Sequence, residues 1–190
     1  MICRPIKADE FLQAEKIMNV AFRFHWDKYP ENESGDRHKN IYGTFEEEQM
    51  TSCIVANAYT CAYFGNDVGM LGVGGVATLP EYRRTGHIRH LLTMILQESY
   101  KRGDVLGSLY PFSHPFYRKF GFENGQFMDK LHLDTDELRQ FPYTGTVRMF
   151  TPGEDPAVIK EMYNTFIHNR NFGCRRRDWE WNALKKDPYL

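Results

Sequence analysis

The chain has 190 residues, with 24 lysines and arginines against 25 aspartates and glutamates, so its formal net charge is −1. A chain of this length builds one good core and has room for the start of a second unit. The near-neutral charge provides no global attraction to nucleic acid or to an anionic membrane, so any basic site has to be local. We therefore expect neither nucleic acid nor membrane as a partner.

The first ten residues contain no long apolar stretch, and no window elsewhere approaches the ~18 apolar residues that span a bilayer. The four cysteines, Cys3, Cys53, Cys61 and Cys174, lie far apart without a CxxC pair, which argues against a zinc site or a dense disulfide framework. Reduced thiols and a cytoplasmic location fit this pattern best. A disulfide between Cys53 and Cys61 across a hairpin is the weaker alternative.

The first part of the chain predicts a strand followed by a helix and a polar loop. Residues 2–7 have a strand pattern, and residues 8–24 have helical periodicity with Asp9 as the cap. Residues 25–40 are polar and turn-rich, which is typical of a loop that covers a site. The apolar face of the predicted helix consists of Phe11, Leu12, Ala14, Ile17, Met18, Ala21 and Phe22.

The middle of the chain alternates strand and helix patterns. Residues 50–79 predict two strands, a turn at 65–67 and a third strand. Residues 88–102 form the clearest amphipathic helix, which Gly103 ends. Further along, the pattern predicts a strand within 105–112, a short helix at 114–121 and a strand at 127–133 with its partner near 122–125.

A boundary is predicted around residues 141–145, where Pro, Tyr, Thr and Gly gather. After it, residues 146–150 predict a strand, residues 155–169 a helix and the tail a further helix. We therefore expect a first domain over residues 1–143 and, over 144–190, an incomplete second lobe made of a strand and two helices.

Basic residues surround a glycine where the amphipathic helix begins. Arg83 and Arg84 precede Gly86, and guanidinium groups suit phosphate oxygens through paired hydrogen bonds. Backbone amides and the dipole at a helix N-terminus bind phosphate, and a glycine lets the ligand approach closely. The pattern R-x-x-G-x-I therefore predicts an anion site, and a solvated basic turn is the alternative.

Two longer stretches around this turn carry a family resemblance. VGGVATLPEYRRTGHIRHLL and, further on, LYPFSHPFYRKFGF resemble the GNAT acetyltransferases, and within them the enhanced intracellular survival (Eis) type. The resemblance covers residues 1–143 in its order of elements. It implies an α/β (α+β) fold, the GNAT acyl-CoA N-acyltransferase fold, with a mixed, mostly antiparallel central sheet flanked by helices. The wider family has Gly or Ala where this chain has Ile88, and Eis-type proteins have a bulky aliphatic residue there.

The resemblance implies acetyl-CoA as co-substrate, no metal, and transfer of the acetyl group to a primary amine of an aminoglycoside, a polyamine or a lysine-like acceptor. By the same resemblance Tyr117 is the general acid that protonates the departing thiolate, and Ser113 contacts the cofactor. Backbone groups of Val76, Ala77 and Thr78 would hold the pantetheine arm and the acetyl carbonyl. The amides around the diphosphate would come from Arg83, Arg84, Thr85, Gly86, His87 and Ile88.

The general base and the acceptor site are less defined. Eis-type enzymes use the terminal carboxylate of a chain about twice as long, and nothing here matches that segment, so water, a loop acid and His25 remain open. Trp26 and Asp27 in the polar loop suit a cationic amine, although a solvated loop is equally compatible. A rival function is a non-catalytic CoA-binding interaction module. Eis-type relatives are oligomers, so a homo-oligomer is an option.

Two further groups of residues have a weaker functional interpretation. His87 and His90 lie one helical turn apart, but no third ligand is evident, so no metal site is predicted. Residues 175–177 are three arginines beside Trp179 and Trp181, a composition that can grip single-stranded nucleic acid. A helix start at an interface between lobes is the favoured interpretation of these arginines.

Overall fold

The structure is a computed structural model that describes residues 1–23, 37–125, 129–151 and 153–186. His25, Trp26 and Asp27 of the predicted polar loop lie outside the described residues. None of the described helices is long and apolar enough to cross a membrane.

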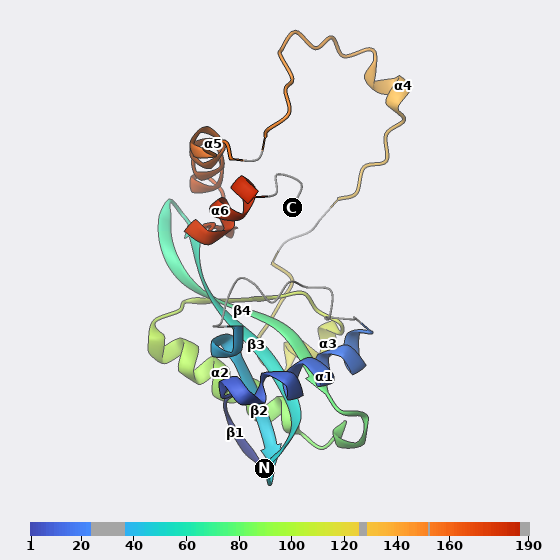
Figure 1. Cartoon of the computed structure of the whole chain (residues 1–190), viewed down its shortest axis with the longest axis vertical. Coiled ribbons are helices and arrows are strands. Elements are labelled where there is room, and N and C mark those ends of the chain that lie inside the picture. The colour runs from blue at the N-terminus through green and yellow to red at the C-terminus, as the bar shows by residue number, and fades with distance from the viewer. Residues whose placement is uncertain (24–36, 126–128, 152, 187–190) are drawn as a thin grey trace.

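A six-stranded sheet forms the centre of the molecule (Figure 1). Five strands lie in the order β1-β2-β3-β4-β5. The sixth, β6, pairs with β3 and is not part of this linear order. All pairings are antiparallel except that of β4 with β5, which confirms the predicted mixed, mostly antiparallel sheet. The strands are β1 (Ile2–Pro5), β2 (Ile41–Glu46), β3 (Gln49–Tyr63), β4 (Asn66–Thr78), β5 (Leu106–Leu109) and β6 (Gly173–Cys174).

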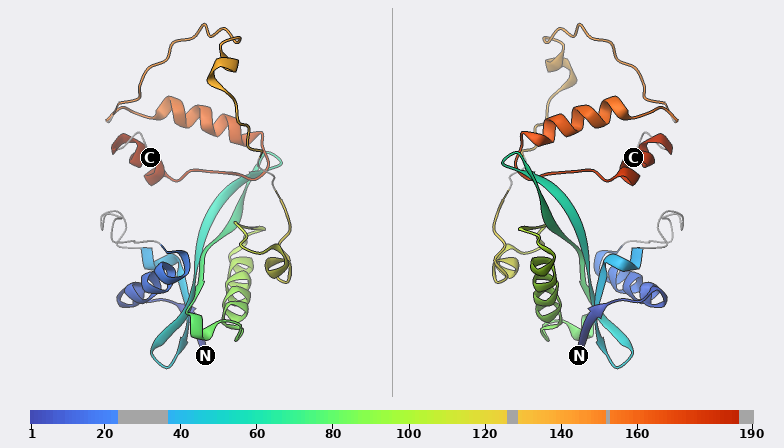
Figure 2. Two further views of the ribbon diagram at one scale, coloured as in Figure 1. Left: turned by 90° about the vertical axis from the view of Figure 1, so that its right-hand side faces the viewer. Right: turned by 90° about the vertical axis from the view of Figure 1, so that its left-hand side faces the viewer.

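Helices cover both faces of this sheet, α1 on one side and α2 on the other, as Figure 2 shows. Short 3-10 turns lie at Ala8–Glu10, Arg37–Asn40 and Pro80–Tyr82. The helices are α1 (Phe11–Phe22), α2 (His87–Arg102), α3 (His114–Arg118), α4 (Thr135–Leu138), α5 (Ala157–His168) and α6 (Asp178–Lys186).

Each face of the sheet has its own apolar core. On the α1 side, Ala14, Ile17 and Met18 pack with sheet residues that include Phe45 and Cys53. On the other side, α2 and α3 pack on the sheet through Leu91, Leu92, Ile95 and Tyr117, together with Ile54, Ala56, Leu71 and Val73. Because neighbouring residues of a strand point to opposite faces, Cys53 and Ile54 belong to different cores.

The first helix buries a narrower face than the sequence predicts. Leu12 is 65% exposed and Phe22 is 42% exposed, so neither belongs to the core. Asp9 does not cap the helix either. Instead Glu10 accepts a hydrogen bond from the backbone N–H of Lys7 and two from the guanidinium of Arg4.

The strands around the long hairpin differ from the prediction in three ways. Residues 50–63 belong to one strand, β3, rather than two, and β2 was not predicted. Cys53 and Cys61 therefore lie on the same strand, where they face Ala77 and Val68, so the weaker alternative, a disulfide between them across a hairpin, is excluded. A strand of 15 residues is possible because β3 changes its neighbour along its length, from β2 to β6.

A β-bulge interrupts β4 near its end. From Val55 to Cys53 the step on β3 is two residues, whereas the matching step from Gly74 to Ala77 on β4 is three. Gly75 has a φ of +55° at this point, and a Cβ there would lie 2.7 Å from Val55. The bulge thus depends on a glycine, and it bends the strand just before the predicted anion site.

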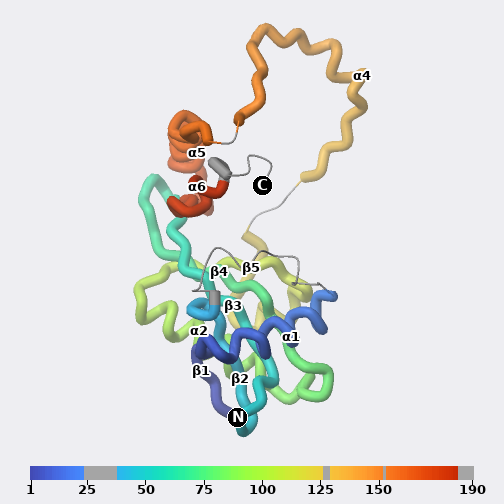
Figure 3. The backbone as a smooth tube through the Cα atoms, in the orientation of Figure 1, coloured from blue at the N-terminus to red at the C-terminus, as the bar shows by residue number. Residues whose placement is uncertain are grey.

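The C-terminal part of the described chain lies at the far end of the β3–β4 hairpin, and Figure 3 traces the path to it. The helices α5 and α6 confirm the two predicted helices. The predicted strands do not form, since residues 129–133 and 146–150 have no regular structure. A strand needs a neighbour for its backbone hydrogen bonds, and neither segment has one among the described residues.

Candidate functional site

The site begins where β4 and β5 part. Their parallel pairing ends with Val73 opposite Leu109, but β4 continues for five further residues to Thr78. Over this stretch the edge of β4 that faces away from β3 has no strand partner within the described chain. Val76, Ala77 and Thr78 lie here, directly after the bulge, so unpaired backbone groups are available where the family resemblance implies the pantetheine arm.

The turn from β4 into α2 exposes a row of backbone amides. Arg84 and Gly86 have φ values of +67° and +93°, which turns the chain sharply before the helix starts. The N–H groups of residues 84–89 donate no hydrogen bond within the described part of the chain, and Gly86 supplies no side-chain cap. These amides, which we call the cradle, lie at the positive end of the helix dipole, an arrangement that suits an anion.

The arginines beside this cradle are free to bind a ligand. Arg83, Arg84 and Arg89 are exposed, and none of them pairs with a carboxylate of the described residues. The guanidinium of Arg83 donates only to the carbonyl of Thr78, at 3.4 Å. A Cβ added at Gly86 would meet only the ring of His90, at 3.7 Å, among the side chains that the structure describes.

His87 turns its side chain away from the cradle and into the core. Its ring is 5% exposed; Nδ1 lies 2.9 Å from the hydroxyl of Thr51, and Nε2 lies 3.1 Å from a carboxylate oxygen of Glu46. Thr51 in turn donates to the carbonyl of Thr44. The backbone amide of His87 still lies at the open N-terminal end of α2. The imidazole, in contrast, links the start of α2 to β2 and β3.

The same imidazole supports the turn that precedes the helix. The ring of Tyr82 stacks on His87 with centroids 5.6 Å apart. The hydroxyl of Thr85 donates to the carbonyl of Tyr82, at 2.5 Å, and the amide of Leu79 donates to Thr51 on β3. These contacts fix the direction in which the free amides of the turn point.

Tyr117 lies in the core on the α2 side of the sheet. Its ring contacts Phe112, Phe116 and Phe122 with centroid separations of 5.2, 5.1 and 6.1 Å. Tyr117 is 3% exposed, and its hydroxyl has no hydrogen-bond partner among the described residues. Burial raises the pKa of Tyr117 to about 12, which keeps the phenol protonated at neutral pH.

The structure brings several predicted site residues to one side of the sheet. Val76, Ile88 and Leu109 pack against the apolar cluster that contains Tyr117. Ser113 precedes α3 as its N-cap residue, and its carbonyl accepts the amide of Tyr117 at 3.3 Å. Val76 from the unpaired end of β4, Ile88 from the start of α2 and the ring of Tyr117 therefore lie on the same face of the sheet.

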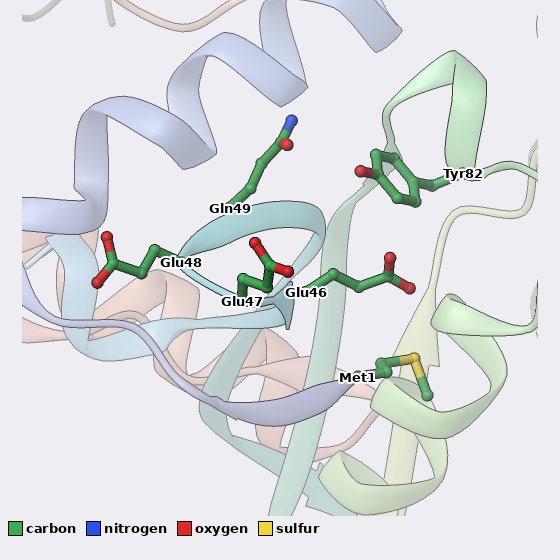
Figure 4. A pocket seen from close by; sticks show the side chains of 6 residues that line it. All are labelled: Met1, Glu46, Glu47, Glu48, Gln49 and Tyr82. Atoms are coloured by element: carbon green, nitrogen blue, oxygen red, sulfur yellow. The ribbon is translucent and has the colours of Figure 1, made fainter.

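A separate hollow of about 620 Å³ lies beside the β2–β3 turn (Figure 4). Its walls include Glu46, Glu47 and Glu48, together with Tyr82. Three carboxylates repel a diphosphate, so this hollow does not belong to the anion site.

The arginines at 175–177 serve the packing of the C-terminal part. Arg175 pairs with Asp67 at 2.9 Å, Arg176 lies over the ring of Trp181, and Arg177 lies over Trp179 and Tyr59. This arrangement supports the interpretation as a helix start at an interface. His90 bonds to the carbonyl of Gly86, and no group of three potential metal ligands occurs among the described residues.

Two features of the site were not predicted. The bulge at Gly75 has a signal in the sequence, because a Gly-Gly pair inside a strand pattern indicates a bulge or a close backbone approach. The network of His87 with Thr51 and Glu46 has none, because its members are 36 and 41 residues apart.

Comparison with protein-family models gives a match over residues 3–125, well over half of the chain, to the model described as Acetyltransferase (GNAT) domain. A comparison with curated proteins finds no match.

Several solved structures share the fold. A probable N-acyltransferase from Enterococcus faecalis V583 superposes with a TM-score of 0.73 at 24% identity, over 95% of this chain and 47% of that one. A GCN5-related N-acetyltransferase from Anabaena variabilis gives 0.71 at 17% identity, over 97% and 47%. Eis1 from Mycobacterium abscessus gives 0.54 at 21% identity, over 64% and 31%. The chain thus spans less than half the length of these relatives.

Proposed function

The chain belongs to the GNAT acetyltransferase family, and on this premise we propose that it transfers an acetyl group from acetyl-CoA to a primary amine. Enzymes of this family generally use acetyl-CoA. The observation that carries the proposal is the run of free amides at residues 84–89, flanked by exposed arginines, where α2 begins. Such a cradle fits the diphosphate of the coenzyme.

The thioester end of the coenzyme is proposed to follow the unpaired edge of β4. Backbone groups of Val76, Ala77 and Thr78 would bind the pantetheine amides and the acetyl carbonyl, and hydrogen bonds to that carbonyl oxygen stabilise the negative charge that develops on it. Ser113 is proposed to contact the coenzyme at the start of α3. The break in β4–β5 pairing supports this path because it leaves the required donors and acceptors unsatisfied.

In the proposed reaction the neutral amine attacks the carbonyl carbon, and the carbon–sulfur bond then breaks. Tyr117 donates its proton to the departing sulfur as general acid. Burial raises the pKa of Tyr117 to about 12, so the phenol carries the proton at neutral pH but is a weaker acid than an exposed tyrosine. We leave the base unassigned, because His25 and the acidic residues of the 25–40 loop lie largely outside the described residues.

The acceptor class follows from the Eis-type resemblance. We propose an aminoglycoside, a polyamine or a lysine-like amine, held near Trp26 and Asp27. Ile88 in the diphosphate loop and the similarity to Eis1 from Mycobacterium abscessus support the Eis-type assignment. The domain division at 143/144 is likewise proposed, with residues 144–190 as the start of a second lobe.

The proposal is tested by measuring release of the CoA thiol from acetyl-CoA with a panel of amines, together with calorimetric CoA binding. We expect amine-dependent release in the wild type. Tyr117→Phe should lower kcat about 100-fold, since general acids contribute on the order of 10²–10⁴, with an unchanged Kd for CoA. Tyr100→Phe, on the exposed face of α2, is the matched control and should change neither quantity.

Gly86→Trp should weaken CoA binding, because the indole would fill the cradle and a side chain at a φ of +93° strains the turn, and circular dichroism checks that the variant stays folded. CoA binding without thiol release for any amine would favour the rival function, a CoA-binding interaction module. A Gly86→Trp variant that binds CoA as tightly as the wild type would contradict the diphosphate site itself.

A further inference from the structure

Two cysteines that are distant in sequence face each other at the far end of the β3–β4 hairpin. β2 pairs with one edge of β3 only as far as Val55. Further along the same edge, β6 pairs with Cys61 and Ala62. In this pairing Cys61 on β3 lies directly opposite Cys174 on β6. Both are free thiols in the structure.

The hydrogen bonds around the pair define its geometry. The amide of Arg175 donates to the carbonyl of Thr60 at 2.8 Å, so Thr60 and Arg175 are the hydrogen-bonded pair next to the two cysteines. Cys61 and Cys174 therefore form a non-hydrogen-bonded pair, in which Cα atoms are typically ~4.5 Å apart and the side chains approach most closely. That spacing lies within the range of about 4.4–6.8 Å that a disulfide requires.

We propose that Cys61 and Cys174 are a redox modification site, where a disulfide fastens β6 and the helices on either side of it to the β3–β4 hairpin. The oxidant is a small-molecule disulfide of the glutathione type. The thiolate of Cys174, the less buried of the two, attacks the reagent and releases one thiol. The thiolate of Cys61 then attacks the Cys174 sulfur of this mixed disulfide and releases the second thiol. Two electrons and two protons pass to the reagent.

Few contacts hold this part of the chain in the reduced protein. β6 pairs with β3 over two residues only. The other links include the Arg175–Asp67 ion pair and a hydrogen bond from the amide of Phe64 to the side chain of Asn171, at 2.7 Å. A covalent bond at this position restrains a segment that noncovalent contacts fix weakly, and because it closes a long loop it also restricts the unfolded chain.

The other two cysteines provide internal controls. Cys53 faces Ala77, and burial raises its pKa to about 12. Cys3 faces Thr44 across the β1–β2 pair. Burial also raises the pKa of both Cys61 and Cys174, so the exchange should be slow at pH 7 and faster as the pH rises.

The experiment incubates the full chain with oxidised glutathione at pH 7 and pH 8.5, alkylates the remaining thiols, and maps the peptides by mass spectrometry without reduction. We expect loss of two of the four thiols, a mass decrease of about 2 Da relative to the reduced protein, and one linked peptide pair containing Cys61 and Cys174. The reaction should be faster at the higher pH. The midpoint of thermal unfolding should rise on oxidation and return on reduction with dithiothreitol.

Cys174→Ser and, separately, Cys61→Ser should abolish the linked peptide, whereas Cys3→Ser should retain it. Cys174→Ser replaces the less buried residue, so it serves as the primary variant if Cys61→Ser unfolds. Glutathione that stays on Cys174, or a link formed through Cys3 or Cys53, would overturn the proposal. No step depends on CoA, so the result is independent of the proposed acetyltransferase activity.

Discussion

The near end of the β3–β4 hairpin, which carries β2, α1 and α2, buries two apolar clusters of its own. At the far end, α5 and α6 contribute only Ile167 and Trp181 to the buried apolar residues among those that the structure describes. The exposed face of α5 includes Val158, at 69%, and Phe166, at 57%. The near end therefore has the burial that stabilises a fold, whereas the far end relies on the hairpin and on polar contacts.

Tyr59 shows how the two ends are joined. A Cβ at Gly72 would lie 2.3 Å from the Tyr59 ring, so this ring packs flat on β4 where a glycine leaves room. The guanidinium of Arg177 lies 5.1 Å from the same ring. The C-terminal part thus packs on an aromatic ring that is itself held by the β3–β4 hairpin. Three matched pairs of substitutions test how different the two ends are.

The largest expected difference concerns the cores. Leu91→Ala should lower the free energy of unfolding by about 3 kcal/mol, because Leu91 is fully buried between α2 and the sheet. Val158→Ala on the exposed face of α5 should change it by about 0.5 kcal/mol or less. Urea unfolding followed by circular dichroism measures both values. A comparable loss for Val158→Ala would show that α5 has an apolar partner of its own.

A smaller difference is expected for two histidines. His87→Ala should cost about 2 kcal/mol, because it leaves Thr51 and Glu46 without their buried partner. It should also weaken CoA binding about tenfold, since the free amides lose the ring that fixes their turn. His168→Ala, at an exposed position of α5, is the control and should leave the Kd for CoA unchanged. An unaltered Kd for His87→Ala would mean that the turn keeps its geometry without the imidazole.

The smallest difference concerns two glutamates that pair with arginines. Hydrogen bonds from the Arg4 guanidinium lower the pKa of Glu10 from 4.5 to about 2. The charged form therefore stabilises the folded state at neutral pH, and this contribution is lost as the pH falls from about 4.5 through 2. Glu10→Gln should lower the stability by about 1 kcal/mol at pH 7, and this difference should shrink as the pH falls to 2 and below.

Glu154 is the matched residue at the far end. The hydroxyl of Thr151 and the guanidinium of Arg148 lower its pKa, but its side chain is 31% exposed against 14% for Glu10, so solvent screens it more strongly. Thermal unfolding of Glu154→Gln between pH 2 and 7 should follow the wild-type curve. If Glu154→Gln reproduced the pH dependence of Glu10→Gln, the proposed difference in burial between the two ends would be wrong.

Local patterns predicted several elements of the fold. The apolar stripe of α2, its ending at Gly103 and the helices α3, α5 and α6 follow from residues that are neighbours in sequence. The strand β2 was missed, since its six residues are recognisable mainly by their pairing with β1 and β3. The strands predicted at 127–133 and 146–150 do not form over their described residues. A strand pattern in the sequence is not sufficient when no neighbouring strand is present to pair with it.

The candidate site likewise has parts that local patterns predicted and parts that depend on distant contacts. The sequence identified the basic turn with Gly86, because a helix start, a glycine and adjacent arginines are local features. It also placed Tyr117 on a short helix after β5 through the family resemblance. It did not predict the inward direction of the His87 ring, which depends on Thr51 and Glu46 from two other strands.

The sequence by itself therefore determined the helical segments, the GNAT family and the basic turn at Gly86, because the pattern of each is contained in a short stretch of chain. Only the tertiary structure decided where β4 and β5 part, which core surrounds Tyr117 and which cysteine faces Cys61. These features arise from contacts between residues tens of positions apart, and their energies come from burial and pairing that no local pattern encodes.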